Sequence, residues 1–118
     1  MLQQCMEKDN TIYLRNMVDK AREAVAFCGD KTLEDFLADS MLQSAVVMKL
    51  IVVGEEARKV SEQVIKEIDL PWRMIVGFRN MAVHEYFDLD LEQVWVTVRE
   101  DLPKLIEAID VYLKAKRE

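Results

Sequence analysis

Apolar residues recur every three or four positions along most of the chain, which is the period of an amphipathic α-helix. In the first segment this period predicts a helix that begins at a cap at Asn10 or Thr11 and runs to about Phe27. Gly29 follows as the expected stop, because glycine readily adopts the left-handed backbone that ends many helices.

A second, shorter helix is marked by its capping residues. Thr32 is followed three residues later by Asp35, and the two form an approximate capping box. In such a box each side chain accepts a hydrogen bond from the backbone of the other residue, which satisfies two free N–H groups. We therefore expect a short helix over Leu33–Ala38.

The longest predicted helix begins at Ser40, with Gln43 completing a capping box, and runs to about Ile68. Its first half, Met41–Val53, is apolar on nearly all sides, so we expect that half to be buried. Gly54 lies in the middle of this helix, where glycine costs about 1 kcal/mol relative to alanine. The simplest explanation is that another helix packs closely against it.

The last third of the chain reads as two more helices. Pro71 suits the first position of a helix over residues 72–85. After a short connector, Asp90 can cap a last helix. Pro103 falls inside that pattern, so it either kinks the helix or opens a new segment capped by Asp101.

Composition agrees with an all-α protein. The chain has 118 residues, of which 51% are hydrophobic, and only three Gly and two Pro. A sheet protein needs more turn-forming residues than this. We predict a single domain over residues 1–118, folded as an up-and-down bundle of four to five main helices, with frayed ends at residues 1–8 and 114–118.

Charge and cysteine content narrow the possible chemistry. The formal net charge of −6 argues against a broad phosphate-binding surface but allows a local basic pocket. Cys5 and Cys28 are isolated and the chain has one histidine, so we expect no metal site and no cofactor. No secretion signal or membrane span is recognisable, and a reduced cytoplasmic protein is the simplest interpretation.

The helix predicted over residues 72–86 has an unusual distribution of side chains. A polar strip separates two apolar faces, and one arginine lies within an apolar face. A helix with two apolar faces needs two packing partners, which are its own bundle and, we infer, a second copy of the protein. The first face holds Trp72, Val76, Arg79, Val83 and Tyr86, and the strip holds Arg73, Gly77, Asn80 and His84.

Each polar residue of this helix has a structural interpretation beside a functional one. Arg79 either pairs with Glu55 or Glu56, or faces a cleft that receives an anion such as phosphate. His84 near the helix end is either a hydrogen-bonded structural residue or a proton-transfer group. Tyr86 on its own is typical of a core residue with its hydroxyl at the edge.

One segment carries a resemblance to a known family. Phe78–Tyr86, with the sequence FRNMAVHEY, resembles the Arg-Asn-x-x-x-His-x-Tyr signature of the HEPN superfamily. The resemblance extends from about Asp9 to Leu113. Four further segments are similar to the HepT-like branch of that superfamily: Gly54–Ala57, Pro71–Arg73, Asp90–Trp95 and Glu100–Pro103.

The resemblance implies a specific function. Proteins of this branch are helical homodimers whose signature helices meet at a cleft, here Trp72–Tyr86, and many are metal-independent endoribonucleases that act as toxins. It implies that Arg79 and His84 are catalytic and that Asn80 supports them. It also implies an antitoxin partner, a minimal nucleotidyltransferase (MNT), which in some members transfers AMP to the signature tyrosine, here Tyr86.

Helix geometry favours a site shared by two protomers. Arg79 and His84 are about 140° apart around an ideal helix, so one protomer does not easily aim both at one phosphate. A two-fold cleft brings two copies of each together. Arg79 and Tyr86 are only about 20° apart, two turns along the same face, so AMP on the tyrosine could reach toward the arginine.

The sequence is also compatible with two other hypotheses about function. The protein can be a non-catalytic dimeric partner, or a nucleotide-binding subunit, of a minimal nucleotidyltransferase, and the acidic net charge supports that interpretation. It can also be a helical dimer whose polar strip is only structural.

Overall fold

The computed structural model describes the backbone of residues 2–117 and the side chains of residues 10–116. All regular structure within these residues is helical, and four helices have 13 residues or more, which confirms the predicted all-α bundle. The elements are α1 (Leu2–Cys28), α2 (Leu33–Leu37), α3 (Ser40–Ala57), α4 (Glu62–Glu67), α5 (Trp72–His84), η1 (Tyr86–Asp88), α6 (Leu91–Val96), η2 (Thr97–Asp101) and α7 (Leu102–Arg117).

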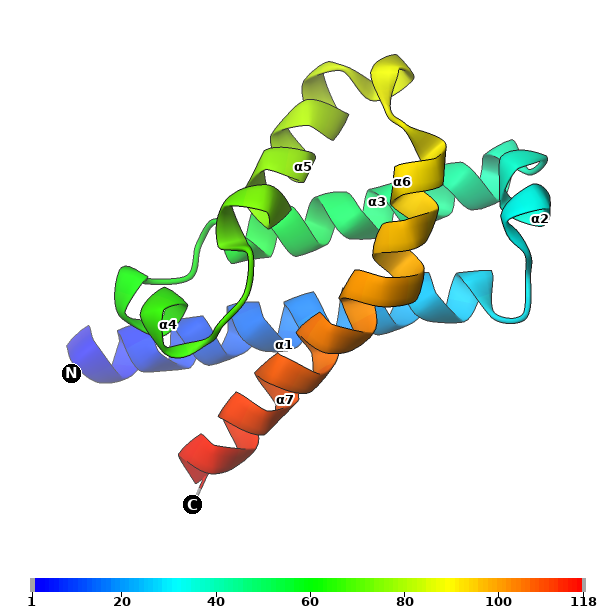
Figure 1. Cartoon of the computed structure of the whole chain (residues 1–118). Helices are drawn as coiled ribbons and strands as arrows, with labels where there is room; N and C mark the ends of the chain where they lie inside the picture. Colours follow the sequence, from blue (N-terminus) through cyan, green and yellow to red (C-terminus); the bar gives the residue numbers. More distant parts are fainter. Residues whose placement is uncertain (1, 118) are drawn as a thin grey trace.

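The long helices α1 and α3 form the base of the bundle. α3 lies between α1 on one side and α5 on the other, and α7 packs across α1 (Figure 1). α6 and η2 lead directly into α7. This arm of the chain contacts α2 through α6, and it contacts α1 through η2 and α7. The molecule measures 50 × 29 × 20 Å, and α3 is the main neighbour of α5.

The core forms where the apolar stripes of α1, α3 and α7 meet. The prediction that the first half of α3 is buried is wrong in part, because Met41 and Met48 are exposed. The largest fully buried side chains are Phe36, Leu14, Met17, Ile109, Val46, Val47, Val94 and Val98.

Local capping signals placed several helix ends correctly. Gly29 has a positive φ of 42° and ends α1. Thr32 and Asp35 form the predicted capping box at the start of α2, with hydrogen bonds of 2.9 and 3.1 Å. Asp90 caps α6 by accepting hydrogen bonds from the backbone N–H groups two and three residues later.

One long-range contact explains two boundaries that were predicted wrongly. α3 ends at Ala57 instead of Ile68, and α4 begins after Ser61, which caps it. Asn10 does not cap α1, which begins at Leu2, but bonds to Ser61 instead. The Asn10 Nδ2 donates to Ser61 Oγ at 3.2 Å, and Asn10 Oδ1 accepts from the Ser61 N–H at 3.0 Å.

The start of α3 also differs from the prediction. Asp39 caps the helix in place of Ser40, and its Oδ1 accepts a hydrogen bond from the Leu42 N–H at 3.0 Å. Gln43 does not complete a capping box. Its amide donates to the carbonyl oxygens of Phe36, at 2.9 Å, and Leu37, and so joins α3 to α2.

Pro103 is accommodated inside a continuous helical arm. The backbone widens to a π-helix over η2, and the Leu102 N–H bonds to the Thr97 carbonyl, five residues earlier. Proline in a regular α-helix clashes with the carbonyl four residues before it. The widened turn relieves that clash, so of the two predicted outcomes, Asp101 capping a separate segment is wrong.

The predicted frayed ends lie partly outside the residues whose side chains are described, and Cys5 lies outside them too. The predictions about the chain ends and about Cys5 therefore stay predictions. Over the residues that were placed, no helix has both the length and the apolar character needed to cross a membrane.

Candidate functional site

The position of α5 on α3 depends on Gly54. A Cβ atom at residue 54 would lie 2.5 Å from Arg79 Cβ and 2.9 Å from the Ile75 carbonyl oxygen. Both distances are well below van der Waals contact, so only glycine allows the two helices to approach this closely. The predicted close packing at Gly54 is therefore confirmed, and the residue packed against it is Arg79.

Arg79 is held at the helix interface by an acidic partner. Its Nε lies 2.8 Å from Glu55 Oε2, although the N–H is not aimed at an acceptor, so the contact is an ion pair rather than a hydrogen bond. The side chain of Arg79 is 21% exposed. Of the two predicted partners, Glu55 is correct. Glu56 instead accepts a hydrogen bond from Asn16 at 3.1 Å.

Asn80 links Arg79 to the polar strip of α5. The Arg79 Nη1 donates to Asn80 Oδ1 at 2.9 Å. The two Cα positions are about 100° apart around the helix, so this bond turns the guanidinium from the α3 interface toward the strip. The Arg79 Nη2 has no hydrogen-bond partner among the described side chains, and is available to an anion.

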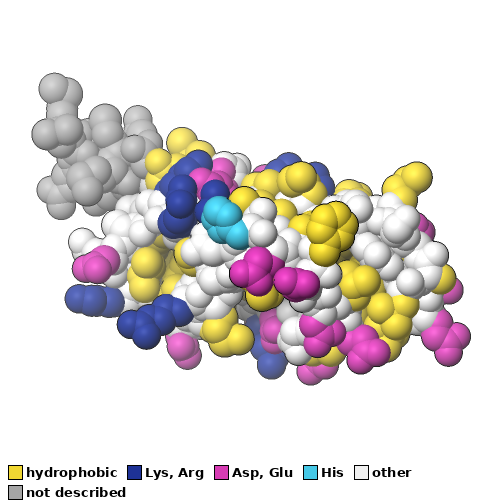
Figure 2. Space-filling model, turned by 90° about the horizontal axis from the view of Figure 1, so that it is seen from above, with side chains coloured by type: hydrophobic (Ala, Val, Ile, Leu, Met, Phe, Trp, Pro, Cys, Tyr) yellow, Lys and Arg dark blue, Asp and Glu magenta, His cyan; other side chains and the backbone are white. Residues whose placement is uncertain are grey.

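His84 is the last residue of α5 and is exposed. The side chains placed around it give it no hydrogen bond or ion pair, so its ring can reach a substrate from solvent. In Figure 2 the histidine, the one cyan side chain, lies beside a group of basic side chains, with acidic side chains on its other flank. The predicted polar strip is thus exposed at Arg73, Gly77, Asn80 and His84.

Tyr86 lies elsewhere than predicted. The helix ends at His84 because Glu85 leaves the helical region, at φ −135° and ψ 49°, and Tyr86 belongs to η1. The Tyr86 hydroxyl is 3.2 Å from the hydroxyl of Ser44 on α3, and Tyr86 is 40% exposed. The predicted alignment of Tyr86 with Arg79 on one helix face is therefore wrong, because it assumed a continuous helix.

Tyr86 and Arg79 contact residues that lie far apart along α3. Tyr86 contacts Ser44 and Arg79 contacts Glu55, and these residues are eleven positions apart, or about 16 Å along the helix. Ser44 was missed by sequence reasoning, since nothing in the pattern distinguished it within an apolar helix. Tyr86 and Arg79 therefore contact opposite halves of α3.

The charge of α5 differs from that of its surroundings. The helix contains Arg73, Arg79 and His84 but no Asp or Glu, in a chain with a formal net charge of −6. The described residues include no group of three or more side chains suited to hold a metal ion. The site is thus a local basic patch, with an imidazole at one end of it.

The buried cysteine lies apart from this site. Burial raises the pKa of the Cys28 thiol, which disfavours the reactive thiolate. Cys28 is therefore a core residue rather than a nucleophile.

Apolar side chains flank the polar strip. Met74, which is 74% exposed, and Met81 lie on one side of it, and Val83 lies on the other. Phe87 in η1 is almost fully exposed, and its ring is perpendicular to the neighbouring Tyr86 ring. Trp72 of the first predicted face and Ala82 of the opposite face are both buried, so the chain's own bundle covers part of each face. What the described part of the chain leaves uncovered is the border of each face next to the strip.

Fold and site together define an all-α bundle of the HEPN type, with the Arg-Asn-x-x-x-His-x-Tyr residues on α5 and the turn after it. The family description "Ribonuclease HepT-like" matches residues 17–112, which is most of the chain. The chain therefore belongs to the HepT-like ribonuclease family.

Curated relatives agree with this membership. A protein of Thermococcus cleftensis named "Probable ribonuclease HepT" is 30% identical over 102 residues, which cover 85% of this chain and 92% of the relative. A protein of Methanocaldococcus jannaschii, provisionally named an RNase, is 27% identical over 106 residues, covering 89% and 97%. No solved structure matches the chain significantly.

Proposed function

We propose that the protein is a metal-independent endoribonuclease, and that α5 carries its active site. The observation that carries this proposal is the pairing of a partly exposed, fixed guanidinium with an exposed imidazole on a helix without carboxylates. Membership of the HepT-like ribonuclease family supports the same activity.

The proposed reaction needs only proton transfer and charge stabilisation. The 2'-oxygen of RNA attacks the adjacent phosphorus, its proton passes to a base, and the bond from phosphorus to the 5'-oxygen breaks. The leaving 5'-oxygen takes up a proton, and the products end in a 2',3'-cyclic phosphate and a 5'-hydroxyl. His84 moves the protons, because imidazole is the side chain that most often serves as general acid and base in enzymes. Arg79 stabilises the charge that develops on the phosphoryl oxygens.

Neighbouring residues prepare Arg79 for this role. Glu55 fixes the Nε end of the guanidinium on the α3 side, and Asn80 fixes Nη1 on the other side. A guanidinium held at two points loses less conformational freedom when it binds phosphate. Glu55 and Asn80 are therefore positioning residues in this proposal.

A homodimer through α5 completes the proposed site. The exposed flank of Met74 and Met81 gives a second copy an apolar surface to cover. A two-fold axis beside this flank brings together two polar strips, so that one His84 can accept the proton while His84 of the second copy donates one. The angle of about 140° between Arg79 and His84 within one helix favours such sharing.

Regulation by a nucleotidyltransferase belongs to the same proposal. We propose that the protein is the cytoplasmic toxin of a HEPN/MNT toxin-antitoxin pair, and that its partner silences it by transferring AMP to Tyr86. The partial exposure of Tyr86 supports this assignment. AMP there acts by bulk and negative charge at the cleft, since Arg79 contacts a different part of α3. Mass spectrometry of protein co-expressed with a minimal nucleotidyltransferase tests the modification, and Tyr86→Phe is its control.

RNA cleavage in EDTA tests the activity. We expect the wild type to cut single-stranded RNA and leave cyclic phosphate ends, and His84→Ala and Arg79→Ala to lose at least a hundredfold in rate. Arg15→Ala is a matched control, because Arg15 is an exposed arginine on α1. An inert wild type, or a His84→Ala variant as active as wild type, refutes the proposal.

A second candidate function is supported by the net charge of −6 and by the partial neutralisation of Arg79 by Glu55. The protein is then a non-catalytic dimeric partner of the nucleotidyltransferase. Co-purification with that enzyme, without RNA cleavage or toxicity, favours this alternative.

A further inference from the structure

No packing contact in the described part of the chain explains why residue 77 of α5 is a glycine. Glycine inside a helix costs about 1 kcal/mol relative to alanine. At Gly54 the close approach of α5 explains that cost, but a Cβ at residue 77 would meet no atom within 4 Å. An open glycine in the middle of a 13-residue helix indicates that something outside the chain approaches its backbone.

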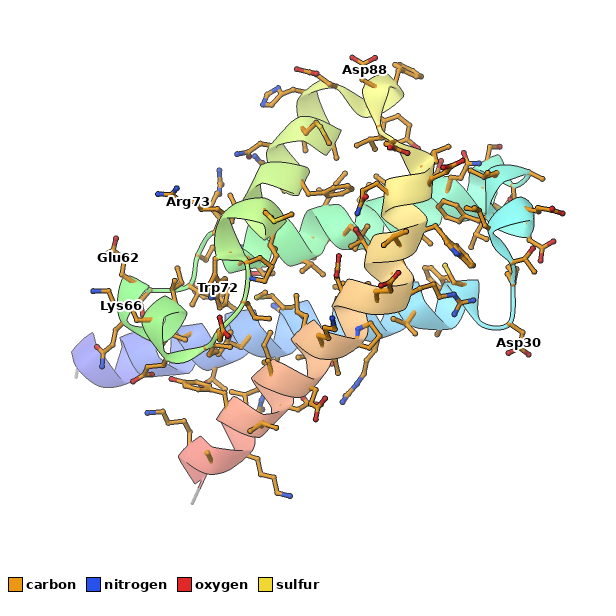
Figure 3. The ribbon with its side chains drawn as sticks, viewed as in Figure 1. Asp30, Glu62, Lys66, Trp72, Arg73 and Asp88 are labelled. Atoms are coloured by element: carbon orange, nitrogen blue, oxygen red, sulfur yellow. The ribbon has the colours of Figure 1, made fainter. Side chains whose placement is uncertain are left out.

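Arg73 lies on the same strip and has no partner among the described residues either. It is exposed, and the described side chains give it no ion pair or hydrogen bond. Figure 3 shows it extending outward from the first turn of α5, whereas the neighbouring Trp72, 8% exposed, points back into the body. Because α5 contains no Asp or Glu, the helix itself offers Arg73 no carboxylate.

The strip is continuous with the proposed active site. Arg73, Gly77, Asn80 and His84 are spaced by four, three and four residues, which places them within about 60° of one another. Arg73 and His84 are eleven residues apart, or about 16 Å along the axis. A strand that enters at His84 and follows the helix therefore passes Gly77 before it reaches Arg73.

The charge of the strip favours an anionic strand over a second copy of the chain. In a two-fold contact centred on this strip, each protomer would present the same cations to the other, which is unfavourable. The apolar flank of Met74 and Met81 offers a second copy a better surface. That arrangement leaves the strip open along the edge of the cleft.

We propose that Arg73 and Gly77 form a second substrate-binding subsite for single-stranded RNA. Arg73 binds a phosphate a few nucleotides from the cut, and Gly77 lets the sugar-phosphate backbone lie directly against the helix. This inference rests on the proposed ribonuclease function and adds where the rest of the strand binds. Arg73 contributes binding and does not take part in the bond-breaking step.

Substrate length separates this subsite from the catalytic residues. A dinucleotide spans only the bond that is cut, whereas an oligomer of about twelve nucleotides covers the strip. We expect Arg73→Gln to cleave the dinucleotide as wild type does, and to lose about three- to tenfold in kcat/KM on the oligomer. Arg15→Gln, which removes the same charge from α1, is the matched control and should leave both substrates unchanged.

Salt dependence gives a second measurement. In a His84→Ala background, which does not cut, fluorescence anisotropy measures oligomer binding. Removing one phosphate contact should lower the slope of log K against log salt by about 0.7 for a single strand. Arg73→Gln should show that change, and Arg15→Gln should not.

The variant Gly77→Ala should change stability and RNA binding in opposite directions. Alanine should raise the free energy of unfolding, because it fits the open space and favours helix, yet it should weaken oligomer binding about threefold or more. Unchanged oligomer binding by Gly77→Ala, or an Arg73→Gln variant that behaves like Arg15→Gln, overturns the subsite. If Gly77→Ala weakens only self-association, the strip is covered by a second copy and the inference also fails. A wild type that neither binds nor cleaves RNA refutes the ribonuclease proposal itself.

Discussion

Replacing Gly54 by alanine should damage the site through the contact between α3 and α5. The new Cβ would lie 2.5 Å from Arg79 Cβ and 2.9 Å from the Ile75 carbonyl oxygen. Neither atom can rotate away, because one is fixed to the backbone and the other belongs to it. The two helices must therefore separate by about 1 Å at this point to restore ordinary contact.

Two opposing terms set the size of the effect on stability. Alanine gains about 1 kcal/mol of helix propensity at residue 54, whereas overpacking in a closely packed interface costs about 1–3 kcal/mol. We expect a net destabilisation of up to about 2 kcal/mol. Catalysis should suffer more, because a displacement of about 1 Å in a catalytic group can cost about a hundredfold in rate.

Urea unfolding and RNA cleavage of the same preparation measure the two effects. Gly77→Ala is the control for the stability measurement, since it has the same propensity gain without any clash. The expected pattern is a loss of stability and of cleavage for Gly54→Ala, and a gain of stability for Gly77→Ala. If both variants are stabilised equally and Gly54→Ala still cleaves at the wild-type rate, the close approach of α5 to α3 is refuted.

Three further changes test other parts of the structure. Glu55→Gln should lower the cleavage rate about tenfold by loosening Arg79, with less than about 1 kcal/mol lost in urea unfolding, because the ion pair is partly exposed; a loss of stability with full activity would contradict this. Arg99→Ala removes hydrogen bonds of 2.7 and 2.8 Å to the Gly29 and Lys31 carbonyls and a stacking contact with Trp95, so urea unfolding should show a loss of about 1–3 kcal/mol. Burial raises the pKa of Cys28, so the neutral thiol contributes stability below the usual thiol pKa, and this contribution declines as the pH rises through the raised value. Peptide-resolved alkylation at pH 8 should find Cys28 slow to react until urea unfolds the protein, and rapid reaction in the native state would contradict its burial.

Local signals in the sequence predicted those helix ends that depend on neighbouring residues. Gly29, the Thr32 and Asp35 box and Asp90 act within four residues of the end they define. The break between α3 and α4 could not be predicted this way. Residues 57–61 contain no Gly or Pro, and the break is fixed by Ser61 bonding to Asn10, which is 51 positions away.

The residues of the candidate site also differ in whether the local sequence could predict their positions. The exposure of Asn80 and His84 and the ion pair of Arg79 followed from helix periodicity and from the cost of burying an unpaired cation. The position of Tyr86 did not, because the backbone leaves the helix at Glu85, directly after His84, and no breaker marks the point. Its partner Ser44 is 42 residues away and became visible only in three dimensions.

The dependence of α5 on a single main neighbour has a consequence for hydrogen exchange. A helix packed on one side exposes more of its surface to solvent, and such elements open by local unfolding at a lower free energy than the rest of a domain. The backbone amides of α5 should then exchange faster than those of α1 and α3, which hold most of the core. Any molecule that covers the free side of α5 slows this exchange, so amide protection would report the occupancy of the site without requiring turnover.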